Sequence, residues 1–178
     1  MKINEVRLET PRLLLRWFRE DDFPDYVEIA TDPEVMKFIG GVQTPFEAWR
    51  AMSAHIGHWY FRGYGLFAVE EKSSGKMIGR IGLMNPQGWP GFELGWTLGR
   101  ASWGKGYATE GARRVLEYVF TDMNRDHVIS CIAPDNINSA RVAERLGESI
   151  EGETELLGKQ VYIYGISRDK WKVTQSTT

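Results

Sequence analysis

The segment between Phe92 and Met123 constrains the fold more than any other part of the sequence. Apolar and polar residues alternate over Phe92–Leu98, which predicts a half-buried strand. Gly104 and Gly106 follow, and a helix is predicted over 108–123. Glycines allow close approach of the backbone to a ligand, and the first amides of a helix lack internal partners. The unit therefore suits either a phosphate or pyrophosphate cradle or a tight strand–helix connection.

Six further strands and three further helices are predicted around this unit. The strands fall over 13–18, 65–70, 77–84, 128–133, 151–157 and 161–167, and the helices over about 20–30, 44–60 and 134–146. Because strands and helices alternate, the predicted class is α/β or α+β around one mixed sheet. No linker or internal repeat divides the 178 residues, so we predict a single domain over 1–178 with a polar tail from about residue 174.

The helix predicted to begin after Thr44 has a clear N-terminal capping signal and apolar or small residues along one face. Thr44 is a capping residue, Pro45 suits the first helical position, and Glu47 completes a capping box. Apolar and small residues recur at helical spacing after it, which predicts one buried stripe. Its members are Phe46, Trp49, Ser53, Ile56 and Tyr60.

Composition excludes several classes of protein. The chain has 22 Lys+Arg and 24 Asp+Glu, a net charge of −2, which argues against a general nucleic-acid binder. The single Cys131 excludes an internal disulfide, and the three histidines lack metal-site spacing, so no metal is expected. Neither a signal peptide nor an apolar run of membrane-spanning length is present, so we expect a soluble, cytoplasmic protein without a membrane partner.

Two nucleotide-binding motifs match the glycine loop only in outline. Gly99–Lys105 has the form G-x-x-x-x-G-K, but Gly106 stands where a P-loop has the serine or threonine that holds magnesium. Read as a dinucleotide-binding fingerprint, the same loop has Thr109 in place of the third glycine. A nucleotide-hydrolysing loop is therefore the weaker alternative.

A different family matches four segments in order. Trp103–Glu110 resembles the acetyl-CoA pyrophosphate loop of the GNAT N-acetyltransferases, Q/R-x-x-G-x-G/A, with Gly106 and Ala108 at the small positions and Trp103 in place of the Gln or Arg. This replacement is similar to the branch that contains the ribosomal-protein N-terminal acetyltransferases. Three other segments resemble the same branch, namely its first strand, its N-x-x-S…L-G helix and its final strand. They are residues 8–16, 136–147 and 164–171.

The resemblance implies a GNAT-type fold and a cofactor site. The expected fold is a central mixed, largely antiparallel sheet of about seven strands flanked by about four helices. Acetyl-CoA would be the cosubstrate and no metal would take part. Its pantetheine arm would pair with the backbone of the strand before the glycine loop, and its pyrophosphate would bind the amides of the loop. Further contacts would come from the helix predicted over 134–146. These residues are Trp96, Thr97, Leu98, Trp103, Gly104, Lys105, Gly106, Tyr107, Ala108, Thr109, Asn136 and Ser139.

Two side chains are candidates for the catalytic roles. Glu93 would be the general base that accepts a proton from the amine, directly or through water, although an alternating strand also predicts a solvent-facing acid there. Many family members place a tyrosine as the proton donor seven residues after the Asn136 position, and here that residue is Ala143. Ser139 would then assist the departing thiolate, unless it is only a first-turn helix residue.

The acceptor remains open between several amines. A set of large rings lies near the expected acceptor side, where it could form an aromatic wall or pack in the core. These rings are Trp49, Trp59, Tyr60, Trp89 and Phe92. The predicted reaction is acetylation of a primary amine, on a protein N-terminus or a small amine metabolite. The alternative, motivated by Ala143, is a non-catalytic acyl-CoA-binding sensor or sequestering module. A homodimer is possible.

Overall fold

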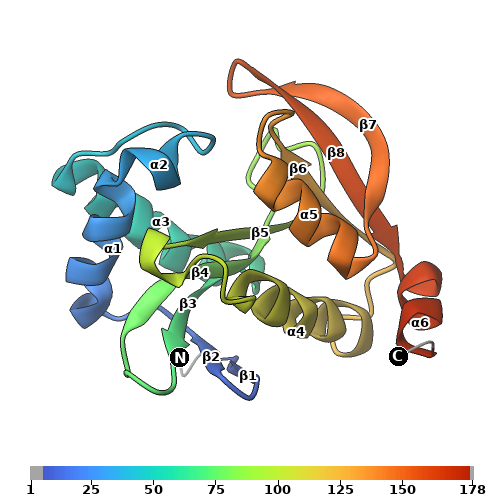
Figure 1. Cartoon of the computed structure of the whole chain (residues 1–178), viewed down its shortest axis with the longest axis horizontal. Coiled ribbons are helices and arrows are strands. Elements are labelled where there is room, and N and C mark those ends of the chain that lie inside the picture. Colours follow the sequence, from blue (N-terminus) through green and yellow to red (C-terminus); the bar gives the residue numbers. More distant parts are fainter. Residues whose placement is uncertain (1–5, 177–178) are drawn as a thin grey trace.

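The computed structural model describes residues 6–176 and arranges them around an eight-stranded sheet (Figure 1). The strands are β1 (Leu8–Glu9), β2 (Leu13–Arg16), β3 (Leu66–Glu71), β4 (Met77–Met84), β5 (Glu93–Leu98), β6 (His127–Ile132), β7 (Ser149–Leu156) and β8 (Lys159–Ser167). The helices are α1 (Phe23–Thr31), α2 (Pro33–Met36), α3 (Pro45–Arg62), α4 (Tyr107–Thr121), α5 (Ile137–Leu146) and α6 (Arg168–Ser176). Short 3-10 turns cover Glu20–Asp22 and Arg100–Ser102. Residues 1–5 and 177–178 of the predicted domain lie outside this description.

The strand order is β1-β2-β3-β4-β5-β6-β8-β7. Every neighbouring pair is antiparallel except β5 and β6, which are parallel. A parallel pair needs a crossover connection, and α4 supplies it. The prediction of a mixed, largely antiparallel sheet is confirmed. The β1–β2 hairpin adds one strand to the predicted seven, and α2 and α6 are added to the four predicted helices.

Helices cover both faces of the sheet with separate cores. One core lies between the sheet and α4, with Ile81 and Leu94 of the sheet against Val115 of the helix. The other lies between the sheet and α1–α3, with Ala68 of β3 among residues such as Tyr26. Side chains of a strand point alternately to the two faces, so the strands supply both cores.

The predicted stripe on α3 is wrong. Thr44 and Glu47 form the expected capping box, but Phe46 and Tyr60 are 69% and 64% exposed. The buried residues of α3 are Ala48, Met52 and Trp59, whose spacing of four and seven is equally helical. The helix carries apolar residues on two faces, and the face with Ala48, Met52 and Trp59 is the one that packs into the two cores.

The last described segment, up to Ser176, is helical rather than extended. The resemblance placed a strand through Trp171, and the tail was predicted from about 174, but α6 runs from Arg168 to Ser176. The Ser167 hydroxyl accepts a hydrogen bond from the Lys170 amide, as a capping residue does. The Trp171 ring packs on Phe120 of α4, with ring centroids 5.2 Å apart. Within residues 6–176, no helix is long and apolar enough to span a membrane.

Candidate active site

The two parallel strands at the centre of the sheet separate soon after they meet. Their register contains one residue pair, Glu93 with Ile129, and the Ile129 amide donates to the Phe92 carbonyl at 3.0 Å. Beyond this pair, hydrogen bonds that involve side chains connect the two strands in place of backbone–backbone hydrogen bonds. The Ser130 hydroxyl lies 2.8 Å from the Leu94 carbonyl oxygen, and the Cys131 amide donates to Glu93 Oε1 at 3.2 Å. The result is a split between β5 and β6 that is closed at its base by polar side chains.

Backbone groups of β5 face this split at every second residue. The carbonyls of Phe92 and Leu94 point toward β6, and period two places Trp96 and Leu98 on the same side. The Thr97 carbonyl instead lies against Gly79 of β4. Of the three residues predicted to pair with pantetheine, Trp96 and Leu98 therefore direct their peptide groups into the split, and Thr97 directs its carbonyl into the β4 ladder.

The glycine loop forms the turn between β5 and α4. Gly104 and Gly106 have φ values of +72° and +79°, in the left-handed region that side chains disfavour. Gly106 is the N-cap of α4 and no side chain caps the helix, so the amides of its first turn are unpaired within the helix. Trp103, at 43% exposure, donates from its indole nitrogen to the Leu98 carbonyl at 2.8 Å. The predicted cradle thus adjoins the open end of the split.

Arg12, from the first hairpin, fixes the loop. Its Nη1 donates to the Lys105 carbonyl at 2.9 Å, its Nε donates to Glu110 Oε2 at 2.6 Å, and its guanidinium lies 4.4 Å from the Tyr107 ring centroid. The Thr10 hydroxyl donates to the other Glu110 oxygen at 2.6 Å. Burial acts to raise the pKa of Glu110, but the hydrogen bonds from Thr10 and Arg12 outweigh it and lower the pKa. We call Thr10, Arg12 and Glu110 the hairpin clamp.

This clamp was not predicted from the sequence. The sequence placed Thr10 and Arg12 in a strand motif and Glu110 at the end of the loop motif, 98 residues after Arg12. A basic residue and an acidic residue in two separate motifs were the available signal. Without a known pairing of the two segments, nothing in the sequence joined them.

Glu93 is a buried acid at the base of the split. The residue is only 6% exposed, so the solvent-facing alternative is wrong. The Trp89 indole nitrogen and the Cys131 amide donate hydrogen bonds to its two oxygens. Burial raises the pKa of Glu93 to about 7, although these hydrogen bonds act to lower it. A carboxyl with this pKa can both accept and release a proton near neutral pH.

Asn136 and Ser139 lie at the start of α5. The Asn136 side chain accepts a hydrogen bond from the Ser139 amide at 3.3 Å and caps the helix. Ser139 is half-buried in the first turn. Ala143, one turn further on, is fully buried against Ile132 and Tyr164. The cap is established by geometry, and the contribution of Ser139 to chemistry stays a prediction.

The aromatic residues on the predicted acceptor side do not form one wall. Trp59 is buried and donates to the Leu66 carbonyl at 2.9 Å, and Phe92 packs on Tyr64. Trp89 contacts Glu93, whereas Trp49 and Tyr60 are exposed.

The helix histidines are occupied in packing. His55 shares a hydrogen bond of 3.1 Å with the Tyr26 hydroxyl, and His58 Nδ1 lies 2.8 Å from the Tyr64 carbonyl oxygen. The described part of the chain contains no group of three or more metal-ligating side chains.

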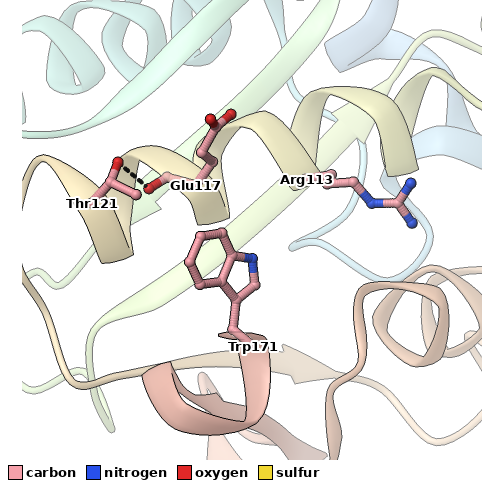
Figure 2. Close-up of a pocket in the computed structure, with 4 residues that line it drawn as sticks. All are labelled: Arg113, Glu117, Thr121 and Trp171. Carbon is pink, nitrogen blue, oxygen red and sulfur yellow. Dashed lines mark hydrogen bonds between the residues drawn. The ribbon is translucent and has the colours of Figure 1, made fainter. Parts of the chain in front are cut away.

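A hollow of about 330 Å³ lies elsewhere, between α4 and α6. Figure 2 shows its lining, with Trp171 facing the α4 residues Arg113, Glu117 and Thr121. These residues follow the first turn of α4 by at least one helical turn, so the hollow is separate from the split and the glycine loop.

The residues of the loop and split fit the expected cosubstrate. An added Cβ on Gly104 would meet no atom within 4 Å, so the turn leaves space beside the uncapped helix. Unpaired amides at a helix N-terminus suit a pyrophosphate, and the exposed strand edge at Trp96 suits the amides of a pantetheine arm.

Known proteins share both sequence and fold with this chain. The acetyltransferase (GNAT) domain matches residues 12–148. The uncharacterized N-acetyltransferase YnaD of Bacillus subtilis is 33% identical over 83% of this chain and 85% of its own length. An acetyltransferase from Agrobacterium tumefaciens is 30% identical, with TM-score 0.82 over 90% of this chain and 94% of its own. A ribosomal-protein alanine acetyltransferase from Vibrio fischeri shares the fold at 21% identity, with TM-score 0.70 over 93% and 98% of the two chains. The chain therefore belongs to the GNAT acetyltransferase family.

Proposed function

We propose that the protein transfers the acetyl group of acetyl-CoA to a primary amine by direct attack in a ternary complex. The observation that carries this proposal is the position of Glu93, a buried acid with a pKa of about 7, at the base of a split whose open end adjoins an uncapped helix N-terminus. Acetyl-CoA supplies an acyl group already activated as a thioester.

Backbone groups hold the cosubstrate in this proposal. Amides from Trp103 to Thr109 bind the pyrophosphate, and the side chain of Lys105 adds positive charge. The peptide groups of Trp96 and Leu98 pair with the pantetheine arm. The amide of Leu98 lies on the same edge and donates to the thioester carbonyl oxygen, which gains negative charge as the amine attacks.

Glu93 prepares the amine. An ammonium group has no free electron pair, so the attacking nitrogen must lose a proton. With a pKa of about 7, roughly half of the Glu93 side chains are carboxylates at neutral pH. Trp89 and the Cys131 amide hold the carboxyl in one orientation while it accepts the proton.

Ser139 assists the leaving group. Ala143 offers no proton donor, and the Ser139 hydroxyl lies on the same helix, one turn nearer the N-terminus of α5. A serine has a high intrinsic pKa, so it acts by a hydrogen bond to the thiolate or by relaying a proton from water. Asn136 keeps this turn in place through its cap.

The acceptor is proposed to be a protein N-terminal amine or a small amine metabolite. The resemblance to the ribosomal-protein branch favours a protein N-terminus. The exposed rings of Trp49 and Tyr60 on α3 offer aromatic surface to either acceptor.

The test follows thiol release from acetyl-CoA with N-terminal peptides and a small-amine library, for wild type, Glu93→Gln and Ser139→Ala. We expect kcat/KM of wild type to rise tenfold per pH unit below about pH 7 and then to level off. In Glu93→Gln, kcat should fall about 10²-fold or more, and kcat/KM should no longer rise with pH below about pH 7. In Ser139→Ala, kcat should fall several-fold.

Glu117→Gln, an exposed acid on α4, is the matched control and should match wild type. Stabilisation by CoA without thiol release for any amine would contradict catalysis and favour the sensor module. Unchanged rates in both site variants would reject the assigned roles.

A further inference from the structure

Glu148 is a buried carboxyl that the proposed reaction does not use. It follows Gly147, the C-cap of α5, and immediately precedes β7. The residue is 4% exposed, and its Oε2 has no hydrogen-bond partner among the described residues. An ionised carboxylate in this position would leave a charged oxygen unpaired away from water, which is among the costliest arrangements in a protein interior.

The contacts of Ser130 indicate that the Glu148 carboxyl carries a proton. Its Oγ lies 2.8 Å from the Leu94 carbonyl oxygen and 3.2 Å from Glu148 Oε1. A hydroxyl has one proton to donate, and a carbonyl oxygen can only accept. Because the Leu94 carbonyl oxygen is the nearer acceptor, we place the Ser130 proton on that bond, and a hydrogen bond between Ser130 and Glu148 then requires a proton on the Glu148 carboxyl.

The groups around Glu148 favour the same state. Glu93 from β5 and Glu151 from β7 are both acidic, and Glu151 is itself paired with His127 of β6 at 2.9 Å. Tyr164 of β8 lies opposite Ser130 in the sheet register. Burial, followed by the charges of Glu93 and Glu151, raises the pKa of Glu148 to about 8. A hydrogen bond donated by Ser130 to an ionised Glu148 acts in the opposite direction, but it withdraws the hydroxyl proton from the Leu94 carbonyl.

Glu93 and Glu148 reach the base of the split from opposite faces of the sheet. Glu93 bonds to the amide of Cys131, and Glu148 contacts the side chain of Ser130, the preceding residue, whose side chain points to the other face. The chain Glu148–Ser130–Leu94 thus ends on the strand residue next to Glu93.

We propose that Glu148 is a neutral acid that braces the split through Ser130 and adds no negative charge beside Glu93. Glu148 is then a positioning residue for the transfer, a role that rests on the proposed function. When Glu148 ionises, the Ser130 proton is drawn to the new carboxylate, the Leu94 carbonyl loses its partner, and a second charge is buried near Glu93. Activity is therefore lost on the alkaline side.

The protonation state is tested without any assay of catalysis. Glu148→Gln keeps the shape and an N–H donor toward Ser130 but cannot ionise, and Glu151→Gln removes a neighbouring exposed acid as the matched control. Urea unfolding is measured from pH 5 to 9. A folded-state pKa above the unfolded value favours folding at low pH, and this advantage disappears as the pH rises toward the folded pKa.

We therefore divide the unfolding equilibrium constant of wild type by that of Glu148→Gln at each pH. This ratio should rise by up to tenfold per pH unit until about pH 8 and then level off. Wild type over Glu151→Gln should lack this slope. A ratio for Glu148→Gln that is independent of pH between 5 and 8 would show an ionised Glu148 and overturn the proposal, whether or not the protein acetylates amines.

Thiol release tests the positioning role. Wild type should lose kcat/KM reversibly above about pH 8, and folded Glu148→Gln should retain its neutral activity within about threefold and lack this alkaline loss. An alkaline loss that persists in Glu148→Gln, or a folded variant that is inactive at pH 7, would reject the role. Absence of activity in wild type would reject the proposed function and leave the unfolding result in force.

Discussion

Replacement of Gly106 by alanine should lower both the free energy of unfolding and the affinity for CoA, and a matched control variant separates the two effects. Gly106 has φ +79°, and an added Cβ would lie 3.6 Å from Arg12 Nη2, an ordinary contact. The left-handed backbone costs an L-residue about 1–2 kcal/mol. Alanine recovers about 0.4–1 kcal/mol by restricting the unfolded chain. The free energy of unfolding should therefore fall by about 1 kcal/mol.

Gly75, in the turn between β3 and β4, is the matched control. It has φ +69°, and an added Cβ meets nothing within 4 Å, so Gly75→Ala should lower the unfolding free energy by a similar amount. Urea unfolding establishes that the two variants are equally destabilised. Isothermal titration with CoA should then show affinity at least tenfold weaker for Gly106→Ala and within twofold of wild type for Gly75→Ala. Equal CoA affinity in the two variants would refute the assignment of the turn to the pyrophosphate.

Two further substitutions test the clamp and the half-buried His55. Arg12→Met removes a half-exposed charged donor from the Lys105 carbonyl, so CoA affinity should fall about tenfold by calorimetry, whereas Arg114→Met on α4 should leave it unchanged; equal affinities would contradict the clamp. Burial lowers the pKa of His55 to about 3 from 6.5, so stability is lost as the pH falls through this window. Urea unfolding at pH 7 and 4.5 should show a smaller loss of stability on acidification for His55→Gln than for wild type, and an equal loss would mean that His55 is not held in its neutral form.

Local patterns predicted most of the elements because their signals are local. The strand Met77–Met84 has the predicted bounds, and α4 begins directly after the glycine loop. Thr44 and Gly147 cap α3 and α5 as their residue types favour. Errors occurred where tertiary packing decides, as on α3, where two apolar faces compete for one sheet surface.

The candidate site, too, could be predicted from the sequence only where its signals are local. The glycine loop and Asn136 were visible as motifs, and Glu93 was a candidate base because its strand runs toward the reacting end of the expected cosubstrate, whereas the alternation by itself predicted a solvent-facing acid. Its burial, with the resulting pKa of about 7, could not be predicted, because it depends on Trp89 and on a β6 amide brought close by the parallel pairing. Glu148 gave no signal, since an acid at the end of a helix is ordinarily exposed.

The hairpin clamp makes the glycine loop depend on the first strands of the sheet. Thr10 and Arg12 contact Glu110 and Lys105 across about a hundred residues of chain. During synthesis the first hairpin leaves the ribosome long before the loop that it holds. The final shape of the loop therefore depends on contacts with the first hairpin and not on the loop sequence alone.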